Sequence, residues 1–185
     1  LENDEWEGRS SNEDVEFLFQ TVFRNKALMD TYEPGSTFKA ITASAALEEG
    51  VVTPDTNFVC STVHIAGYNI NCWKHGGHGA ETFRLGVYNS CNPVFVKTGL
   101  ALGISKFYQY ARNFGLMEKT GITLNGEPAD TEYQWHKKPQ EIDLAVSSFS
   151  QRFTISPLQL VTAYSAIANG GNLMKPILVK QISDS

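Results

Sequence analysis

A proline-glycine turn that runs into an alanine-rich segment constrains the fold of this chain more than any other feature. Ser36 follows the turn directly, and residues 40–49 favour a helix that Gly50 would end. Residues three apart on a helix share a face, so we expect Ser36 and Lys39 to meet one turn apart. The sequence therefore predicts a hydroxyl group and an amine side by side at the N-terminal end of a helix.

This pair is suited to nucleophilic catalysis. The N-terminal end of a helix carries about half a positive charge, and the backbone N–H of Ser36 is expected to donate to an oxyanion that forms there. For Lys39 to act as a base near neutral pH, its pKa has to fall from about 10.4 to about 7, and burial or neighbouring groups have to cause that change. The structural alternative is a surface lysine after a helix-capping serine, because the Ser-x-x-Lys pattern is common by chance.

A second polar pair, Ser90-x-Asn92, follows later in the chain. Residues 81–89 have a helical pattern, and Asn92 with the proline after it suits the start of another helix that runs to Leu102. On local grounds the connection is structural, because Asn-Pro is a common helix start. Next to the first pair, however, a second hydroxyl could relay a proton between the lysine and a leaving group. The asparagine amide could hold the lysine and a substrate amide.

These two motifs and their surroundings resemble the transpeptidase domain of penicillin-binding proteins, in particular the monofunctional, class B group. The resemblance covers roughly residues 20–180 of the chain. Besides the two motifs it includes residues 24–27 and 30–39 around the serine, His78-Gly79, residues 89–95, and residues 149–151 and 155–160. The long run into Ser36 makes the resemblance specific.

The resemblance implies a role for each residue of the two motifs. Ser36 would attack the carbonyl group of a D-alanyl-D-alanine stem peptide, or of a β-lactam, and form an acyl-enzyme. Lys39 would take the serine proton, Ser90 would pass it to the leaving amine, and Asn92 would orient the lysine and bind the acyl side-chain amide. An amine from a neighbouring stem peptide would then resolve the ester into a peptidoglycan cross-link, without a cofactor.

The family fold contains more than this sequence shows. In the family, helices form one lobe of an α/β fold with a central antiparallel sheet, and a Lys-Thr/Ser-Gly motif on a strand lines the cleft. Two literal copies occur, at residues 97–99 and 119–121, but we expect them in a helix and in a turn-rich link. The motif strand would follow residues 175–182, and the first strands would precede Leu1.

We therefore expect a fragment that is mainly α, with a small β-hairpin and an incomplete central sheet. Because losing one oxyanion donor costs about 2.7–4 kcal/mol, we also expect slow or absent acylation.

The resemblance also implies a location and partners. The parent protein would work at the extracytoplasmic face of a bacterial membrane, anchored by a segment outside this chain. Its partners would be peptidoglycan stem peptides, β-lactams and cell-wall synthesis proteins. The chain itself has no run of about 18 apolar residues, and its net charge of −5 argues against nucleic-acid binding. Two other functions stay open: a β-lactamase, which would need a water-activating group, and a non-enzymatic β-lactam sensor or scaffold.

The domain organisation is expected to be simple. Residues 1–14 are interpreted as a polar lead-in, and residues 15–185 as one partial transpeptidase domain. The hydrophobic fraction of 42% in 185 residues supports a single core-containing domain. Other patterns predict three helices, a polar loop and a terminal strand, over residues 15–29, 105–114, 156–168, 130–140 and 175–179 respectively.

The cysteines and histidines allow two interpretations. Residues 58–73 alternate around a central Ala-Gly and predict a hairpin, whose turn would place Cys60 opposite Cys72 for a disulfide. Cys60, Cys72, His75 and His78 could instead form a zinc site. The short spacing between the last three crowds a tetrahedral site, so we expect no metal and interpret the histidines as loop residues.

Overall fold

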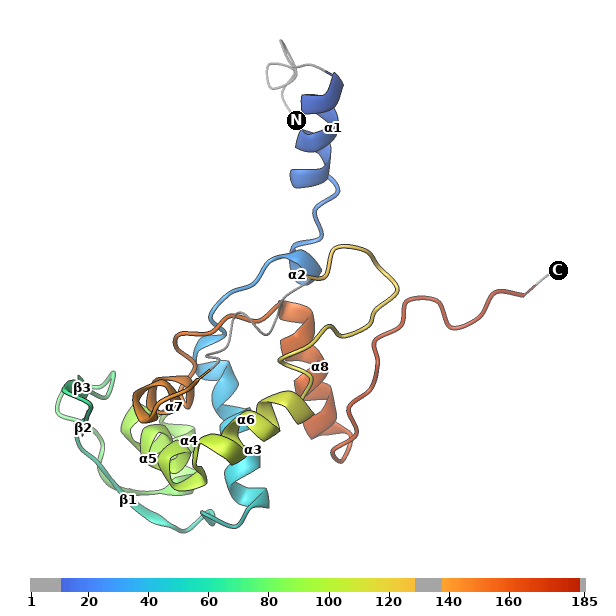
Figure 1. Cartoon of the computed structure of the whole chain (residues 1–185). Coiled ribbons are helices and arrows are strands. Elements are labelled where there is room, and N and C mark those ends of the chain that lie inside the picture. Colours follow the sequence, from blue (N-terminus) through green and yellow to red (C-terminus); the bar gives the residue numbers. More distant parts are fainter. Residues whose placement is uncertain (1–10, 129–137, 184–185) are drawn as a thin grey trace.

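The computed structural model describes residues 11–128 and 138–183 of the chain (Figure 1). The helices are α1 (Ser11–Gln20), α2 (Lys26–Met29), the 3-10 helix η2 (Gly35–Phe38), α3 (Lys39–Glu48), α4 (Phe83–Tyr88), α5 (Asn92–Leu102), α6 (Ile104–Asn113), α7 (Glu141–Ser147) and α8 (Pro157–Ala168). The strands are β1 (Asn57–Cys60), β2 (Val63–Ile65), β3 (Tyr68–Ile70) and β4 (Gly79–Thr82). The described residues are thus mainly helical, as predicted. None of their helices is both long and apolar enough to cross a bilayer.

Helix α3 lies between two hydrophobic cores. Ile41 and Ala45 pack with Phe38 into one core, which also contains side chains of α6, α7 and α8. Ala43 and Ala46 pack into the other core, with side chains of α5, α7 and the strands. A helix that is apolar all round is a buried helix, and small alanine side chains let its neighbours approach closely. The alanine-rich segment after Ser36 is therefore the central helix of the molecule (Figure 1).

Helix α5 is the second buried helix and packs against α3 and α7. Val94, Phe95 and Val96 are fully buried. Gly99 lets α7 approach, because a Cβ atom at this position would lie 2.5 Å from the Cβ atom of Ser148. The beginnings of α3 and α5 are therefore held in a fixed relation to each other by close packing.

The predicted hairpin is confirmed only in its inner part. Strands β2 and β3 pair antiparallel around Ala66 and Gly67, whose φ angles are +48° and +80°. Positive φ at both central residues is typical of the tight two-residue turn of a hairpin. Strand β1 does not continue this hairpin but pairs with β4, in the register Asn57↔Thr82.

The single helix predicted over residues 15–29 is wrong. Helix α1 ends at Gln20, and Asn25 caps the separate helix α2 by accepting a hydrogen bond from the backbone N–H of Ala27 at 3.2 Å. Helix α1 also begins inside the expected lead-in, and it projects away from the other helices (Figure 1). Val15 is 51% exposed. The apolar side of this helix therefore does not pack in front of the Ser36 turn.

Two further helices differ from the sequence prediction. Helix α4 begins at Phe83 rather than residue 81, because Glu81 is in β4 and Thr82 provides the N-cap. Helix α7 was not predicted at all, since its N-cap residue is Gln140, which is outside the usual set of capping residues. Helices α5, α6 and α8 lie where the sequence predicted them, within about one residue.

The predicted strand over residues 175–179 is also wrong. These residues are irregular, and the side chains of Ile177, Leu178 and Val179 are each more than half exposed. A strand needs a hydrogen-bonded neighbour, and the described residues provide none for this segment. Most of the polar loop predicted over residues 130–140 lies outside the described residues, which resume at residue 138.

Candidate active site

Ser36 lies on a turn that leads directly into α3. The 3-10 helix η2 contains it, so residue 36 stands at the N-terminal end of helical backbone. Gly35 has a φ of +63°, a conformation that glycine adopts without strain. The Thr37 hydroxyl donates to the Pro34 carbonyl at 2.6 Å, and the Tyr164 hydroxyl from α8 donates to the Thr37 carbonyl at 2.5 Å. The exposed Ser36 side chain is therefore presented on a turn that is held from two sides.

Lys39 contacts each of the other three residues of the site. Its side chain is buried, with 4% exposure, and its Nζ atom lies 3.2 Å from Ser36 Oγ. The same Nζ atom lies 2.8 Å from the Ser90 carbonyl oxygen, 2.9 Å from Ser90 Oγ and 2.6 Å from Asn92 Oδ1. The structure thus brings together all four residues that the sequence indicated, from two segments far apart in the chain.

The surroundings of Lys39 shift it towards its neutral form. Burial lowers the pKa of Lys39 to about 8, although electrostatic interactions with the neighbouring Cys91 and Cys72 act in the opposite direction. A protonated amine has three N–H donors and four acceptors lie within reach, so one acceptor is always left over. Ser36 Oγ is the most distant of the four. A neutral Lys39 amine can instead accept the proton of the Ser36 hydroxyl.

Ser90 and Asn92 reach Lys39 from the connection between α4 and α5. Ser90 has a φ of +50°, and a non-glycine residue in this region costs about 1–3 kcal/mol. The residue between them, Cys91, is the N-cap residue of α5 and is fully buried. Burial of Cys91 anchors the connection, and the strained Ser90 backbone directs both of its oxygen atoms at the lysine.

A third segment borders the nucleophile turn. Tyr32 and Ile155 form an antiparallel bridge with two hydrogen bonds of 3.0 Å. The Glu33 carboxylate accepts a hydrogen bond from the Arg152 backbone N–H at 2.9 Å. These contacts place the segment before α8 beside the turn that carries Ser36. The sequence runs around residues 30–39 and 149–160, which both contribute to the resemblance, therefore lie side by side.

The geometry of this site can be compared with known proteins. The sequence pattern of the family described as "Penicillin binding protein transpeptidase domain" matches residues 5–185. The chain belongs to this family. The resemblance of the sequence to the transpeptidase domain of class B penicillin-binding proteins is confirmed.

Relatives of the chain agree with the family assignment. Stage V sporulation protein D of Bacillus subtilis is 41% identical over 163 residues, which are 87% of this chain and 25% of that protein. Peptidoglycan D,D-transpeptidase PbpA of Mycobacterium tuberculosis is 32% identical over 166 residues, 84% of this chain and 32% of that protein. The transpeptidase domain of Burkholderia pseudomallei penicillin-binding protein 3 has a similar structure, with a TM-score of 0.76, 26% identity and coverage of 87% of this chain and 48% of that one. The chain thus spans about a quarter to a third of the curated relatives' length.

The two literal copies of the third penicillin-binding motif have other structural roles. The copy at residues 97–99 lies inside α5, and its lysine donates to the Val59 carbonyl at 2.6 Å. The copy at residues 119–121 is irregular, and its threonine hydroxyl donates to the Glu127 carboxylate at 2.6 Å. Both were expected to lie away from a cleft strand, and neither copy is in a strand.

Sequence reasoning missed the residues that support this candidate site from a distance. Tyr164 holds the nucleophile turn by its hydroxyl, and Glu33 ties that turn to the backbone of Arg152. No local pattern pairs these residues, because their partners are more than a hundred positions away in the chain. The run of residues 149–160, noted for its resemblance, was the only signal that this region belongs to the site.

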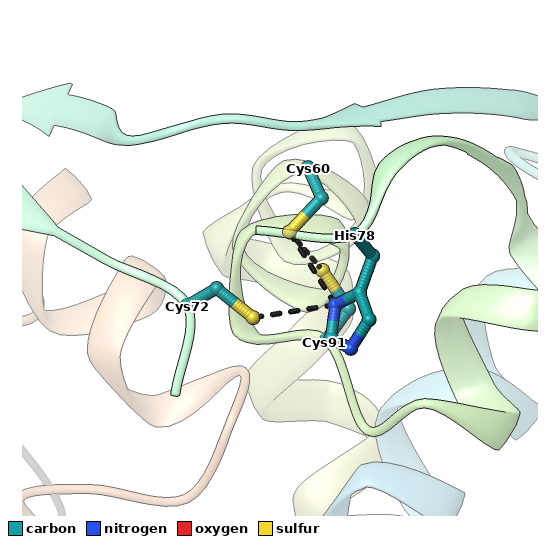
Figure 2. Close-up of side chains that lie close together, drawn as sticks. All are labelled: Cys60, Cys72, His78 and Cys91. Carbon is teal, nitrogen blue, oxygen red and sulfur yellow. Dashed lines mark hydrogen bonds between the residues drawn. The ribbon is translucent and has the colours of Figure 1, made fainter. Parts of the chain in front are cut away.

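The cysteines are arranged differently from the prediction. Cys60 is paired with Gly79 of β4 and does not lie across the hairpin from Cys72. All three cysteines are among the described residues and are free thiols, so the structure has no Cys60–Cys72 disulfide. His75 is exposed. Cys60, Cys72 and His78 instead converge with Cys91, the buried residue between the two members of the second motif (Figure 2).

Proposed function

We propose that this chain provides the nucleophile and the proton-transfer groups of a peptidoglycan D,D-transpeptidase that is also acylated by β-lactams. The observation that carries the proposal is the position of the buried Lys39 Nζ atom, within hydrogen-bond distance of Ser36 Oγ, Ser90 Oγ and Asn92 Oδ1. A base of lowered pKa that contacts both a nucleophile and a second hydroxyl is the arrangement that acyl transfer requires.

Acylation follows from this arrangement. Neutral Lys39 takes the proton of the Ser36 hydroxyl while Ser36 Oγ bonds to the carbonyl carbon of the penultimate D-alanine. The carbon–nitrogen bond to the terminal D-alanine then breaks, and Ser90 relays a proton from the Lys39 ammonium to the leaving amine. With a β-lactam the same steps open the ring amide. The N-terminal end of η2 and α3 supplies positive partial charge near the developing oxyanion.

Deacylation uses the same groups in the reverse direction. The amine of a second stem peptide attacks the ester carbon, its proton passes to the neutral lysine through Ser90, and Ser36 leaves as a hydroxyl. Asn92 keeps the lysine in place through its Oδ1 atom and has its amide nitrogen left for the acyl side chain. No step requires a metal or an organic cofactor.

The setting of the reaction belongs to the same proposal. The protein that carries this chain acts at the extracytoplasmic face of a bacterial membrane, is anchored by a segment outside these residues, and works on stem peptides together with other cell-wall synthesis proteins. What supports this is the family assignment and the printed name of the Mycobacterium relative, a peptidoglycan D,D-transpeptidase. The 185 residues alone are expected to acylate slowly, because neither literal copy of the third motif is in a strand.

The test is labelling with a fluorescent penicillin, applied to the protein that carries this chain. We expect one label per chain on Ser36, found by peptide mass mapping and absent from the Ser36→Ala variant. Ser44→Ala is the matched control, because Ser44 lies on α3, into which the Ser36 turn leads, and its hydroxyl donates to the Ala40 carbonyl of the same helix at 2.8 Å. Label retained by Ser36→Ala, or no label on the wild type, would overturn the proposal.

Two measurements separate the transpeptidase from the alternatives: the lifetime of the penicillin label distinguishes a β-lactamase, and wall synthesis in cells distinguishes a sensor or scaffold. A transpeptidase keeps the penicilloyl ester for a long time, whereas a β-lactamase releases it within seconds and frees Ser36 for another cycle. A sensor or scaffold would be labelled, but cells carrying Ser36→Ala would still synthesise a normal wall.

A further inference from the structure

Three cysteines and one histidine from four separate parts of the chain meet beside the active site (Figure 2). Cys60 ends β1, Cys72 follows β3, His78 precedes β4, and Cys91 is the N-cap residue of α5. Their ligand atoms all lie within 4.8 Å of one another. Such a gathering of soft donor atoms has no role in the acyl transfer described above.

The distances fit a tetrahedral metal site. With Zn–S bonds of about 2.3 Å and Zn–N bonds of about 2.0–2.1 Å, neighbouring ligand atoms lie about 3.8 Å apart for two sulfurs and about 3.5 Å apart for sulfur and nitrogen. The Nδ1 atom of His78 lies 3.6 Å from Cys60 Sγ and 3.4 Å from Cys72 Sγ. Cys91 Sγ lies 3.0 Å from Cys60 Sγ. The Cys60 and Cys91 sulfur atoms have to move apart by about 0.8 Å to receive the ion, and all four ligand atoms already lie within 4.8 Å of one another.

The loop between β3 and β4, which carries Gly77 and His78, passes close to Cys60. Gly77 has a φ of +73°, and a Cβ atom there would lie 2.5 Å from the Cys60 carbonyl oxygen and 3.3 Å from Cys60 Sγ. Only glycine lets the loop pass so close to Cys60. The Trp73 ring packs edge-on against His78 and its Nε1 atom donates to the Asn89 carbonyl at 3.0 Å. The histidine is therefore held from one side and the loop is tied to the segment before Ser90.

Burial and charge also favour a cation. Cys60 and Cys91 are buried, while Cys72 and His78 are half-buried, so an ion has an entry path. The buried Glu81 side chain lies beside Cys91 and accepts a hydrogen bond from Asn89 Nδ2 at 2.9 Å through its Oε2 atom. A cation bound at the cysteines would be close to this buried acidic group, which favours a positive charge there.

We propose that Cys60, Cys72, His78 and Cys91 bind one zinc ion in a structural site that holds the loop between α4 and α5. Four protein ligands leave no open position for water, which is the mark of a structural rather than a catalytic site. Three thiolates and an imidazole select zinc over magnesium or calcium, which prefer oxygen. Binding converts three thiols to thiolates and releases three protons to solvent, with no oxidation or reduction.

The site has a consequence for the active site because Cys91 lies between Ser90 and Asn92. A metal bond to Cys91 fixes the backbone that aims both residues at Lys39. The zinc set weighed from the sequence contained His75, which is exposed, and lacked Cys91. The fourth ligand, Cys91, comes from beyond β4 and α4 in the chain.

The first test measures bound metal. The protein is purified under reducing conditions, loaded with zinc sulfate, desalted and analysed by inductively coupled plasma mass spectrometry, and we expect about one zinc per chain. Because even outer partners of a zinc site are worth about 10–100-fold in affinity, Cys72→Ser and His78→Ala should bind zinc more than about 100-fold more weakly. His75→Ala is the matched control and should keep the ion. Ser36→Ala should keep it too, which separates this site from the acylation chemistry.

The second test does not depend on any variant folding. Cobalt(II) added to the metal-free wild-type protein should give the strong visible bands of a tetrahedral ion and a sulfur-to-cobalt charge-transfer band, and zinc should displace both. Absence of these bands together with metal-free wild-type protein would overturn the proposal. Equal zinc retention by His78→Ala and His75→Ala would also overturn it, as would a Cys60–Cys91 disulfide in the reduced preparation, detected by blocked alkylation.

Discussion

At the scale of single residues, Lys39 shows how burial can prepare a common side chain for the role of base that we propose for it. It is an ordinary lysine in the sequence, and its chemical role depends on a 4% exposure and on oxygen atoms supplied by Ser90 and Asn92. Desolvation disfavours the ammonium form, whereas electrostatic interactions with Cys91 and Cys72 favour it. The first effect is larger and lowers the pKa to about 8.

The pKa of Lys39 predicts how acylation depends on pH. Because neutral Lys39 is the reactive form, the rate should rise with pH and level off above a midpoint at about 8. At pH 7 about one tenth of the protein would then have the neutral amine. The second-order rate constant for labelling by fluorescent penicillin, measured from pH 6 to pH 10, tests this. A midpoint above pH 10 would show that Lys39 is not the base.

The same shift affects stability. The folded state binds the Lys39 proton less tightly than the unfolded state, so the unfolding free energy should increase as pH rises from about 8 towards 10.5. Below pH 8 the cost of charging the buried amine is fully present. A Lys39→Met variant should not show this increase.

Two substitutions of Ser90 distinguish the effect of its hydroxyl group on acylation from the effect of its backbone strain on stability. Ser90→Ala and Ser90→Gly both remove the proton relay, so each should slow acylation by about 100-fold or more. Glycine adopts a φ of +50° without strain, and Ser90→Gly should therefore unfold with a free energy about 1 kcal/mol higher than Ser90→Ala. Thermal and denaturant unfolding of the two variants gives this difference. Greater stability of the alanine variant would show that the residue is not strained.

At the scale of elements, helices with strong end signals were predicted well and the others were not. Ser156 with Pro157 and Gln159 marks the start of α8 by a capping box, whose two hydrogen bonds join residues three apart in the chain. Helix α7 follows Gln140, a residue type that rarely caps helices, although the Asp143 carboxylate accepts a hydrogen bond from the Gln140 N–H at 2.9 Å, and α7 packs against α5. Its sequence alone therefore had little signal to offer.

The capping box of α8 makes a measurable contribution. Ser156 Oγ accepts a hydrogen bond from the Gln159 N–H at 3.2 Å, and the Gln159 side chain accepts one from the Ser156 N–H at 2.9 Å. Ser156→Ala should lower the unfolding free energy by about 1 kcal/mol. Ser165→Ala, on the exposed side of the same helix, is the control and should change it by less than about 0.5 kcal/mol. Equal effects of the two changes would contradict the role of the cap.

At the scale of the whole molecule, α3 connects the two cores and α1 joins neither of them. The active site stands at the beginning of α3, so both cores have to form before Ser36, Lys39 and the loop before α5 come together. The stability of different regions should therefore be unequal.

Hydrogen exchange tests this unequal stability. Backbone amides of residues 42–46 in α3 should exchange slowest, because opening them disrupts both cores. Amides of residues 15–20 in α1 should exchange fastest among the helices, since that helix projects from the body (Figure 1). Exchange followed by mass spectrometry under native conditions distinguishes these regions. Protection of α1 equal to that of α3 would contradict the description.

The sequence by itself determined the Ser36–Lys39 pair, the helices α5, α6 and α8, and the family, because each depends on neighbours within a few residues or on long specific runs. Only the tertiary structure decided that Lys39 is buried, that β1 pairs with β4, and that Cys91 joins Cys60, Cys72 and His78. These features depend on contacts between segments far apart in the chain. Local pattern cannot specify such contacts, because packing of the two cores selects them.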